Sequence, residues 1–159
     1  MNDELVFRVK SYPSFGLKGY ICDKSLTVYN DGRVTNSIYV YDNLDTPVEE
    51  KVIGRVSGEI VNEVLHYYDL RQWSIGCIPS HLSGSIIDGP IYEFIFGDKR
   101  VVAVGIKRYD PEEVKKNNFL YYFDHQDSIK YINLLLDIYG EVKGILTKHG
   151  LDVEFPIKS

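Results

Sequence analysis

The residues of this chain best placed for acid–base chemistry are Asp124, His125 and Asp127, which fall within four positions. General acid–base catalysis needs such groups within hydrogen-bond reach of one another and of a substrate. The same residues precede an apolar-periodic stretch, where an aspartate caps a helix N-terminus and complements its dipole. Because helix capping explains these two aspartates without a catalytic site, the sequence does not favour an enzyme. A hydrolase-type enzyme that uses His125 with Asp124 or Asp127 stays open as an alternative.

A second set of reactive side chains comprises Cys77, Ser80 and His81, with Cys22 elsewhere in the chain. Structural zinc takes four cysteine or histidine ligands at short spacings, and only Cys77 and His81 are near each other here. Neighbouring Ser80 and His81 do not point at each other, and no Gly-x-Ser-x-Gly turn is present. We therefore expect no metal site, and we interpret His81 as a polar loop residue available for contact with a partner.

Phosphate-binding loops of the types Gly-x-x-x-x-Gly-Lys-Ser/Thr and Gly-x-Gly-x-x-Gly are missing from the sequence, and we expect no cofactor. Basic residues between positions 99 and 116 are interleaved with acidic ones that largely cancel their field. The net charge of -5 disfavours binding to nucleic acid and to anionic membrane surfaces. It remains compatible with a basic protein partner.

Composition indicates one globular domain spanning residues 1–159. Apolar residues make up 44% and charged residues 26%, an ordinary balance for a chain with a hydrophobic core. The N-terminal residues do not resemble a signal peptide, and no apolar run approaches the length of a membrane span. A core of this size does not require a disulfide, so the two cysteines need not lie in an oxidising compartment. We therefore expect a soluble, cytoplasmic small domain of bacterial type.

The first predicted hairpin, Tyr20 to Tyr29 followed by Arg33 to Tyr41, decides where a row of tyrosines points. A two-residue turn at Asp31-Gly32 mixes aliphatic and aromatic side chains on each face. A three-residue Asn30–Gly32 turn, with Gly32 in a left-handed bulge, gathers the aliphatic side chains on one face. A one-residue slip moves every side chain across the sheet, so we predict the bulged turn.

This register places a tyrosine stripe on the face away from the aliphatic core, formed by Tyr29, Tyr39 and Tyr41. Tyrosine is enriched at protein interfaces because it brings contact area with few rotatable bonds. The stripe and His81 are therefore our candidate interaction surface. Burial under another segment of the same chain is the alternative that the sequence leaves open.

Apolar periodicity predicts two amphipathic helices, at about 57–70 and 126–149. Ser57 is a plausible N-cap of the first, and Gly150 follows the second as a C-terminal signal. Gly140 and Gly144 weaken the second helix unless a strand or another helix packs there. Further strands are expected at 4–9, 52–56, 73–77, 92–96, 99–106 and 119–123. Residues 42–50 and 76–90 are expected as loops, and 110–118 as a loop or single helical turn.

The elements together predict an α+β two-layer sandwich, with a mainly antiparallel, twisted sheet of about six or seven strands and both helices on one face. For function we expect a non-catalytic protein-interaction module with a protein partner, or a homodimer. One form of it is an immunity-type protein whose acidic surface masks a basic toxin. A small-molecule-binding domain with a pocket between the sheet and the C-terminal helix is the alternative.

Overall fold

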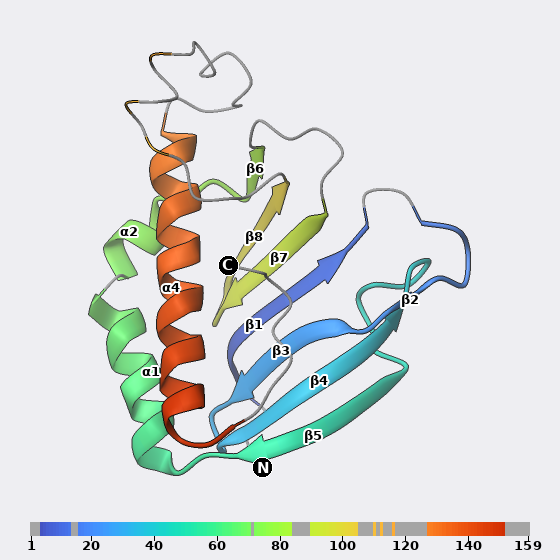
Figure 1. Cartoon of the computed structure of the whole chain (residues 1–159), viewed down its shortest axis with the longest axis horizontal. Helices are drawn as coiled ribbons and strands as arrows, with labels where there is room; N and C mark the ends of the chain where they lie inside the picture. Colours follow the sequence, from blue (N-terminus) through green and yellow to red (C-terminus); the bar gives the residue numbers. More distant parts are fainter. Residues whose placement is uncertain are drawn as a thin grey trace.

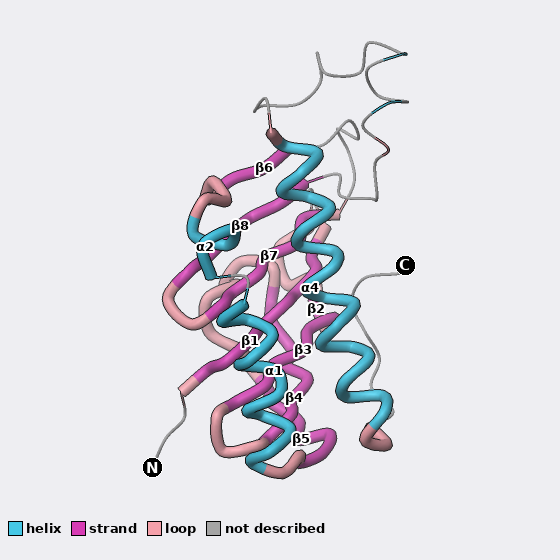
Figure 2. Tube along the Cα trace, turned by 90° about the vertical axis from the view of Figure 1, so that its left-hand side faces the viewer, coloured by secondary structure: helices cyan, strands magenta, loops and turns pink. Residues whose placement is uncertain are grey.

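The computed structural model describes residues 4–13, 16–70, 72–83, 90–104, 110, 112, 116 and 127–151. This part of the chain forms one eight-stranded sheet with helices on one face, the predicted α+β two-layer sandwich (Figures 1 and 2). The strands are β1 (Leu5–Tyr12), β2 (Ile21–Cys22), β3 (Lys24–Tyr29), β4 (Arg33–Val40), β5 (Glu49–Arg55), β6 (His81–Ser83), β7 (Ile91–Phe96) and β8 (Lys99–Val104).

The sheet runs in the order β2-β4-β3-β1-β7-β8-β6, and β5 also pairs with β4. All pairs are antiparallel except that of β6 with β8. The N-terminal strand β1 therefore lies between the two predicted hairpins and joins them into one sheet. Predicted strand 119–123, most of the segment 110–118, and the candidate catalytic residues Asp124 and His125 lie outside the described residues.

The first hairpin has the predicted bulged turn. Val28 pairs with Val34 and Thr27 with Thr35, which leaves Asn30, Asp31 and Gly32 as the loop. Gly32 has a φ of 93°, in the left-handed region that favours glycine. A side chain there would also collide with the Val56 carbonyl oxygen, because a Cβ would lie 2.2 Å from it. The register therefore rests on a position that only glycine occupies without strain.

Helix α1 (Gly58–Leu70) starts where its cap was predicted. The Ile60 N–H donates to the Ser57 carbonyl at 3.1 Å and lies 3.4 Å from the Ser57 hydroxyl oxygen. Val61 and Val64 are buried against the sheet. The predicted polar face is exposed throughout and consists of Glu59, Asn62, Glu63, His66 and Asp69.

Helix α4 (Ser128–Lys148) crosses the same face of the sheet as α1 (Figure 1). At its C-terminus the Gly150 N–H donates to Thr147 and the Leu151 N–H to Leu146, which is the Schellman arrangement. At Gly140 and Gly144 a Cβ would meet no heavy atom within 4 Å, so contact with a strand does not explain these two glycines. No helix in the described ranges combines the length and apolarity that crossing a bilayer requires.

The strand predicted at 73–77 is wrong, because these residues form the short helix α2 (Gln72–Gly76). Ile75 and Ile78, three positions apart, are both buried in the core, whereas Trp73 and Cys77 are exposed. Ile78 follows the helix in a turn, in which its N–H donates to the Ile75 carbonyl at 3.1 Å. The burial of both side chains outweighs the alternating pattern from which a strand was predicted.

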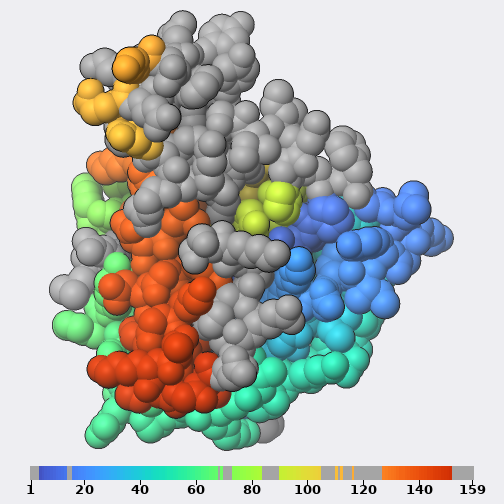
Figure 3. All heavy atoms as spheres, viewed as in Figure 1, coloured from blue at the N-terminus to red at the C-terminus, as the bar shows by residue number. Residues whose placement is uncertain are grey.

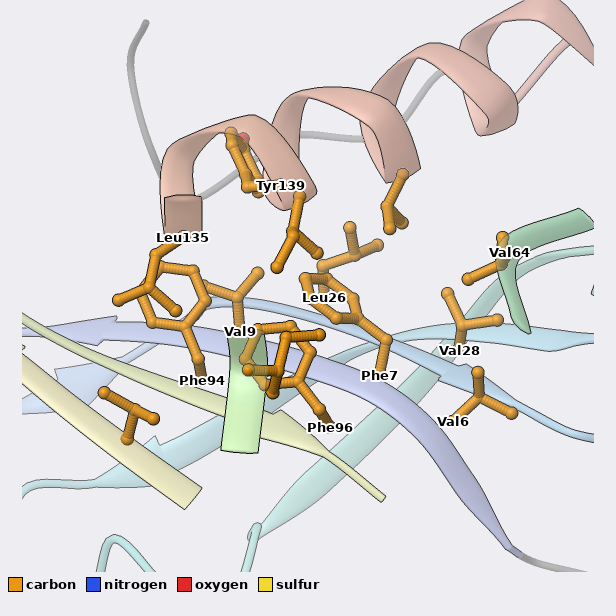
Figure 4. Packing of buried hydrophobic residues seen from close by; sticks show 14 of the residues in the cluster. Val6, Phe7, Val9, Leu26, Val28, Val64, Phe94, Phe96, Leu135 and Tyr139 are labelled. Atoms are coloured by element: carbon orange, nitrogen blue, oxygen red, sulfur yellow. The ribbon is translucent and has the colours of Figure 1, made fainter. Parts of the chain in front are cut away.

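The core lies between the sheet and the helices. Figure 4 shows Leu135 and Tyr139 of α4 above the rings of Phe94 and Phe96 and beside Val9. All five side chains are at most 2% exposed. Each large apolar side chain buried in this way contributes about 1.5–3 kcal/mol.

Candidate protein-contact surface

The second face of the sheet, opposite the helices, is lined by polar side chains that are buried. Strand pairing places Lys10 opposite both Ser25 and Glu93, and Thr27 opposite Thr35. Lys10 and Glu93 are at most 4% exposed. Buried polar groups destabilise a protein unless they are paired, so the partners of these residues decide what this face does.

An ion-pair cluster occupies the middle of this face. Lys10 Nζ lies 3.3 Å from Glu93 Oε1 and 4.4 Å from the centre of the Tyr39 ring. Lys10 also donates a hydrogen bond to the Leu44 carbonyl, in the loop between β4 and β5. Arg100 Nε donates to the other oxygen of Glu93 at 3.0 Å. Burial lowers the pKa of Lys10, and the neighbouring Glu93 carboxylate opposes this shift.

A second polar network lies beside the cluster and links three strands to β1. The Tyr29 hydroxyl donates to Glu50 at 2.6 Å, and the Thr35 hydroxyl donates to the same oxygen at 3.0 Å. Arg8 donates to the Thr27 hydroxyl at 2.9 Å and to the Tyr29 hydroxyl at 3.3 Å. Burial and the hydrogen bond to Glu50 raise the pKa of Tyr29 to about 12. These contacts tie the edge strand β5 to the centre of the sheet.

The tyrosine stripe lies on this second face. Tyr29 is 8% exposed and Tyr39 is 1% exposed, so both are buried, as the alternative reading of the sequence allowed. Tyr41 is half-buried, and its ring lies against Gly16. In the described residues neither the Tyr39 hydroxyl nor the Ser37 hydroxyl has a partner in hydrogen-bond geometry. Burial raises the pKa of Tyr39, whereas Arg8 lowers it, and the Ser37 side chain lies near enough to the phenol to lower it further.

His81, the fourth predicted surface residue, is exposed, but the prediction that it lies in a loop is wrong, because His81–Ser83 form β6 and pair with β8. Strands β8, β7, β1 and β3 separate it from the strand that carries Tyr39. The fold therefore does not bring His81 together with the tyrosine stripe.

The residues considered for catalysis or metal binding form no cluster that the structure can show. Asp127 stands at the N-cap of α4 and its carbonyl accepts the Tyr131 N–H, but its side chain makes no capping bond. Cys22 is buried and Cys77 is exposed, and both thiols are free. Within the described ranges no three His, Cys, Asp or Glu side chains gather in a way that could hold a metal ion.

Large apolar side chains that face solvent gather at one end of the sheet. Of seven such residues in the described part of the chain, four lie beside the Val40 end of β4 and form what we term the sheet-end patch: Leu17, Tyr20, Ile21 and Val48. Val52 and Ile53 lie further along β5, toward the Asn30–Gly32 turn, and Trp73 lies on α2. Ile21 pairs with Val40, and the Val48 N–H donates to Ile38, so both flank β4. Figure 3 shows the blue and cyan atoms of this end projecting away from the orange-red helix α4.

The sheet-end patch does not extend along β5. Ile21 lies beside Val40, on the face that carries α4, whereas Val52 lies opposite Thr35, five positions along β4 and on the second face. Around the patch, exposed acidic residues outnumber exposed lysines: Asp23, Asp42, Asp45, Glu49 and Glu50 against Lys18, Lys24 and Lys51. The surface is thus apolar with a mildly acidic rim.

Sequence reasoning missed this patch because it interpreted 42–50 as a polar loop and Tyr20 to Tyr29 as one strand of a hairpin. The adjacent apolar residues Val52 and Ile53 behind a charged run were a signal for exposed apolar side chains on β5, because no alternating pattern buries both on one face. Comparison with models of protein families finds no match, and no curated protein matches the sequence.

Proposed function

We propose that this chain is a non-catalytic protein-binding module that contacts its partner through the sheet-end patch. The observation that carries the proposal is the gathering of four of the seven exposed large apolar side chains in the described residues at the Val40 end of β4. Contiguous exposed apolar surface rimmed by polar residues is typical of protein-interaction sites. Single exposed residues such as Trp73 need no such explanation.

The charge of the rim favours a basic partner. The chain carries a net charge of -5, and acidic side chains predominate around the patch. Complementary charge raises the association rate and disfavours wrong partners. An immunity-type protein that masks a basic toxin is the specific form we propose. The two free thiols support a cytoplasmic location, where thiols stay reduced.

A pocket between the sheet and α4 receives less support. The space that such a pocket needs is occupied by the phenyl rings and aliphatic side chains of the core (Figure 4). The enzyme alternative rests on His125 and Asp124, which lie outside the described residues.

The experiment compares a patch variant, Ile21→Ser with Val48→Ser, with the control Trp73→Ser. A partner is first captured with the wild-type chain and identified, and its affinity for each purified variant is then measured by calorimetry. We expect the patch variant to lose at least about tenfold in affinity, which is about 1.4 kcal/mol, and the control to be unchanged. Equal affinity of the patch variant and the wild type would refute the proposed surface.

Two further readouts separate the forms of the proposal. Light scattering of the wild-type chain shows whether the captured partner is a second copy of itself. If the partner is a different protein, its expression without this chain should arrest growth for the immunity form to hold. A partner with a net negative charge would contradict the proposed electrostatic match.

A further inference from the structure

The loop 42–48 between β4 and β5 contributes Val48 to the sheet-end patch and two acidic residues to its rim. Its two ends are fixed by backbone hydrogen bonds, from the Asn43 N–H to Val40 and from the Val48 N–H to Ile38, both at 2.8 Å. Between these bonds the Leu44 carbonyl reaches across the second face of the sheet to Lys10. The middle of the loop is thus joined to a strand that is not its neighbour in the sheet, since β3 lies between β1 and β4.

Lys10 is well suited to hold this loop because it is itself held from the opposite side. Its ammonium group has three donors and no acceptor. Glu93 Oε1 lies 3.3 Å away, the Leu44 carbonyl accepts another bond, and the Tyr39 ring lies beneath the charge. The side chain is 5% exposed, so Leu44 is an acceptor that water does not readily replace while the loop is in place.

The other charges around Lys10 are consistent with this role. The guanidinium groups of Arg8 and Arg100 repel its charge, and Glu93 attracts it. Asp45, the residue after Leu44, lies close enough to Arg100 to interact with it electrostatically. The loop therefore meets positive groups of the second face at two successive residues.

We propose that Lys10 is a positioning residue that holds loop 42–48 in the geometry needed for contact with the partner. This inference rests on the proposed function, since the loop contributes to the sheet-end patch. Fixing a loop in its bound conformation raises affinity because less conformational entropy is lost on binding. Lys10 thus acts on the partner through the backbone of Leu44, without touching the partner.

The test is hydrogen exchange of the loop in the variant Lys10→Met, with Lys130→Met, which removes an exposed lysine of α4, as the control. In Lys10→Met the buried Glu93 keeps its bond to Arg100. We expect amides of 42–48 to exchange roughly ten- to a hundredfold faster, as loss of a charge-assisted hydrogen bond implies, while β1 and β7 amides stay protected. Unchanged exchange in the loop overturns the inference.

A second variant distinguishes a positioning role from a general loss of stability. Glu93→Gln removes the ion pair but leaves the bond from Lys10 to Leu44, so exchange should rise across the sheet without a selective increase in 42–48. If Lys10→Met does not fold, the wild-type protein provides the measurement. The Lys10 ammonium should then give a slowly exchanging resonance coupled to the Leu44 carbonyl carbon, and its absence overturns the inference.

Neither exchange experiment requires a partner, so the inference can fail while the proposed function stands. When a partner is in hand, Lys10→Met should weaken binding about tenfold or more, and Lys130→Met should not. If the loop is loosened but affinity is unchanged, the hydrogen bond exists but positions nothing for binding, which also overturns the proposal.

Discussion

The Tyr29 hydroxyl donates a 2.6 Å hydrogen bond to the Glu50 carboxylate and thereby joins β3 to β5 across the strand between them. Tyr39 lies on the same face, is more completely buried, and has no hydrogen-bond partner among the described residues. Tyr29 and Tyr39 belong to the same predicted stripe and thus differ in whether the phenol hydroxyl forms a hydrogen bond.

This contrast predicts opposite effects for two substitutions that each remove one oxygen. Tyr29→Phe should lower the free energy of unfolding by about 1–3 kcal/mol, because Glu50 and Arg8 each lose a partner in a partly buried network. Tyr39→Phe should leave it within about 0.5 kcal/mol of wild type or raise it, because an unpaired buried hydroxyl is removed. Denaturant titration of both variants measures this, and equal losses would show that Tyr39 has a partner.

The pKa of Tyr29, about 12, predicts a loss of stability in alkali. The phenol titrates near 10 in the unfolded chain and higher in the folded one, so the folded state binds the proton more tightly. This contribution is therefore fully present below pH 10 and is lost as the pH rises from about 10 to about 12. Burial is the first cause and the Glu50 hydrogen bond the second.

Glu50→Gln isolates the second cause, because it keeps an acceptor of similar shape but removes the negative charge. Tyrosinate absorbance should show one phenol titrating at lower pH in the variant than in the wild-type protein, with the others unchanged. An identical titration curve in both proteins would mean that Glu50 does not act on Tyr29.

The Lys10–Glu93 pair predicts a large cost for losing its acid. Glu93→Leu leaves Lys10 buried without its counter-ion and should destabilise the fold by about 3–5 kcal/mol. Lys51→Met breaks the exposed contact with Glu49, whose atoms lie 4.0 Å apart, and should cost less than about 0.5 kcal/mol. Thermal unfolding of the two variants measures the difference between their losses of stability. Equal losses would contradict the prediction and would mean that water takes the place of Glu93 beside Lys10.

Two glycines predict changes of opposite sign. Gly32→Ala should destabilise by at least about 2 kcal/mol, because its φ of 93° is strained for alanine and the new methyl group meets the Val56 carbonyl. Gly140→Ala should stabilise by about 0.5–1 kcal/mol, because the position is helical, exposed and unobstructed. Calorimetry measures both, and light scattering of Gly140→Ala serves as its control. A destabilised Gly140→Ala with altered mass would instead show that a second copy packs on this helix.

The features that could be predicted from sequence are those decided by neighbours along the chain. Ser57 caps α1 because its own carbonyl and hydroxyl face the free N–H of Ile60. Gly150 ends α4 because its φ is 84°, in the left-handed region that glycine adopts without strain. The Asn30–Gly32 turn was predictable because only one register aligns the aliphatic side chains.

The site was less predictable, because it depends on which strands become neighbours. That β1 lies between β3 and β7 is not encoded in any local pattern, and it places Lys10 beside Glu93. The tyrosine stripe was assigned to the correct face, but its exposure depends on what covers that face. The helix α2 was missed for the same reason, since Ile75 and Ile78 are buried by contacts with the core.

By itself, the sequence determined the two long helices, the bulged first turn and the division of the first hairpin into an aliphatic and a polar face. Hydrogen bonds and steric limits within a few residues are enough to decide these. Tertiary structure alone decided that the polar face is internal, that Lys10 reaches Leu44, and that apolar side chains remain exposed at one end of the sheet. Burial is a property of the whole packed chain, and it exists only once distant strands have paired.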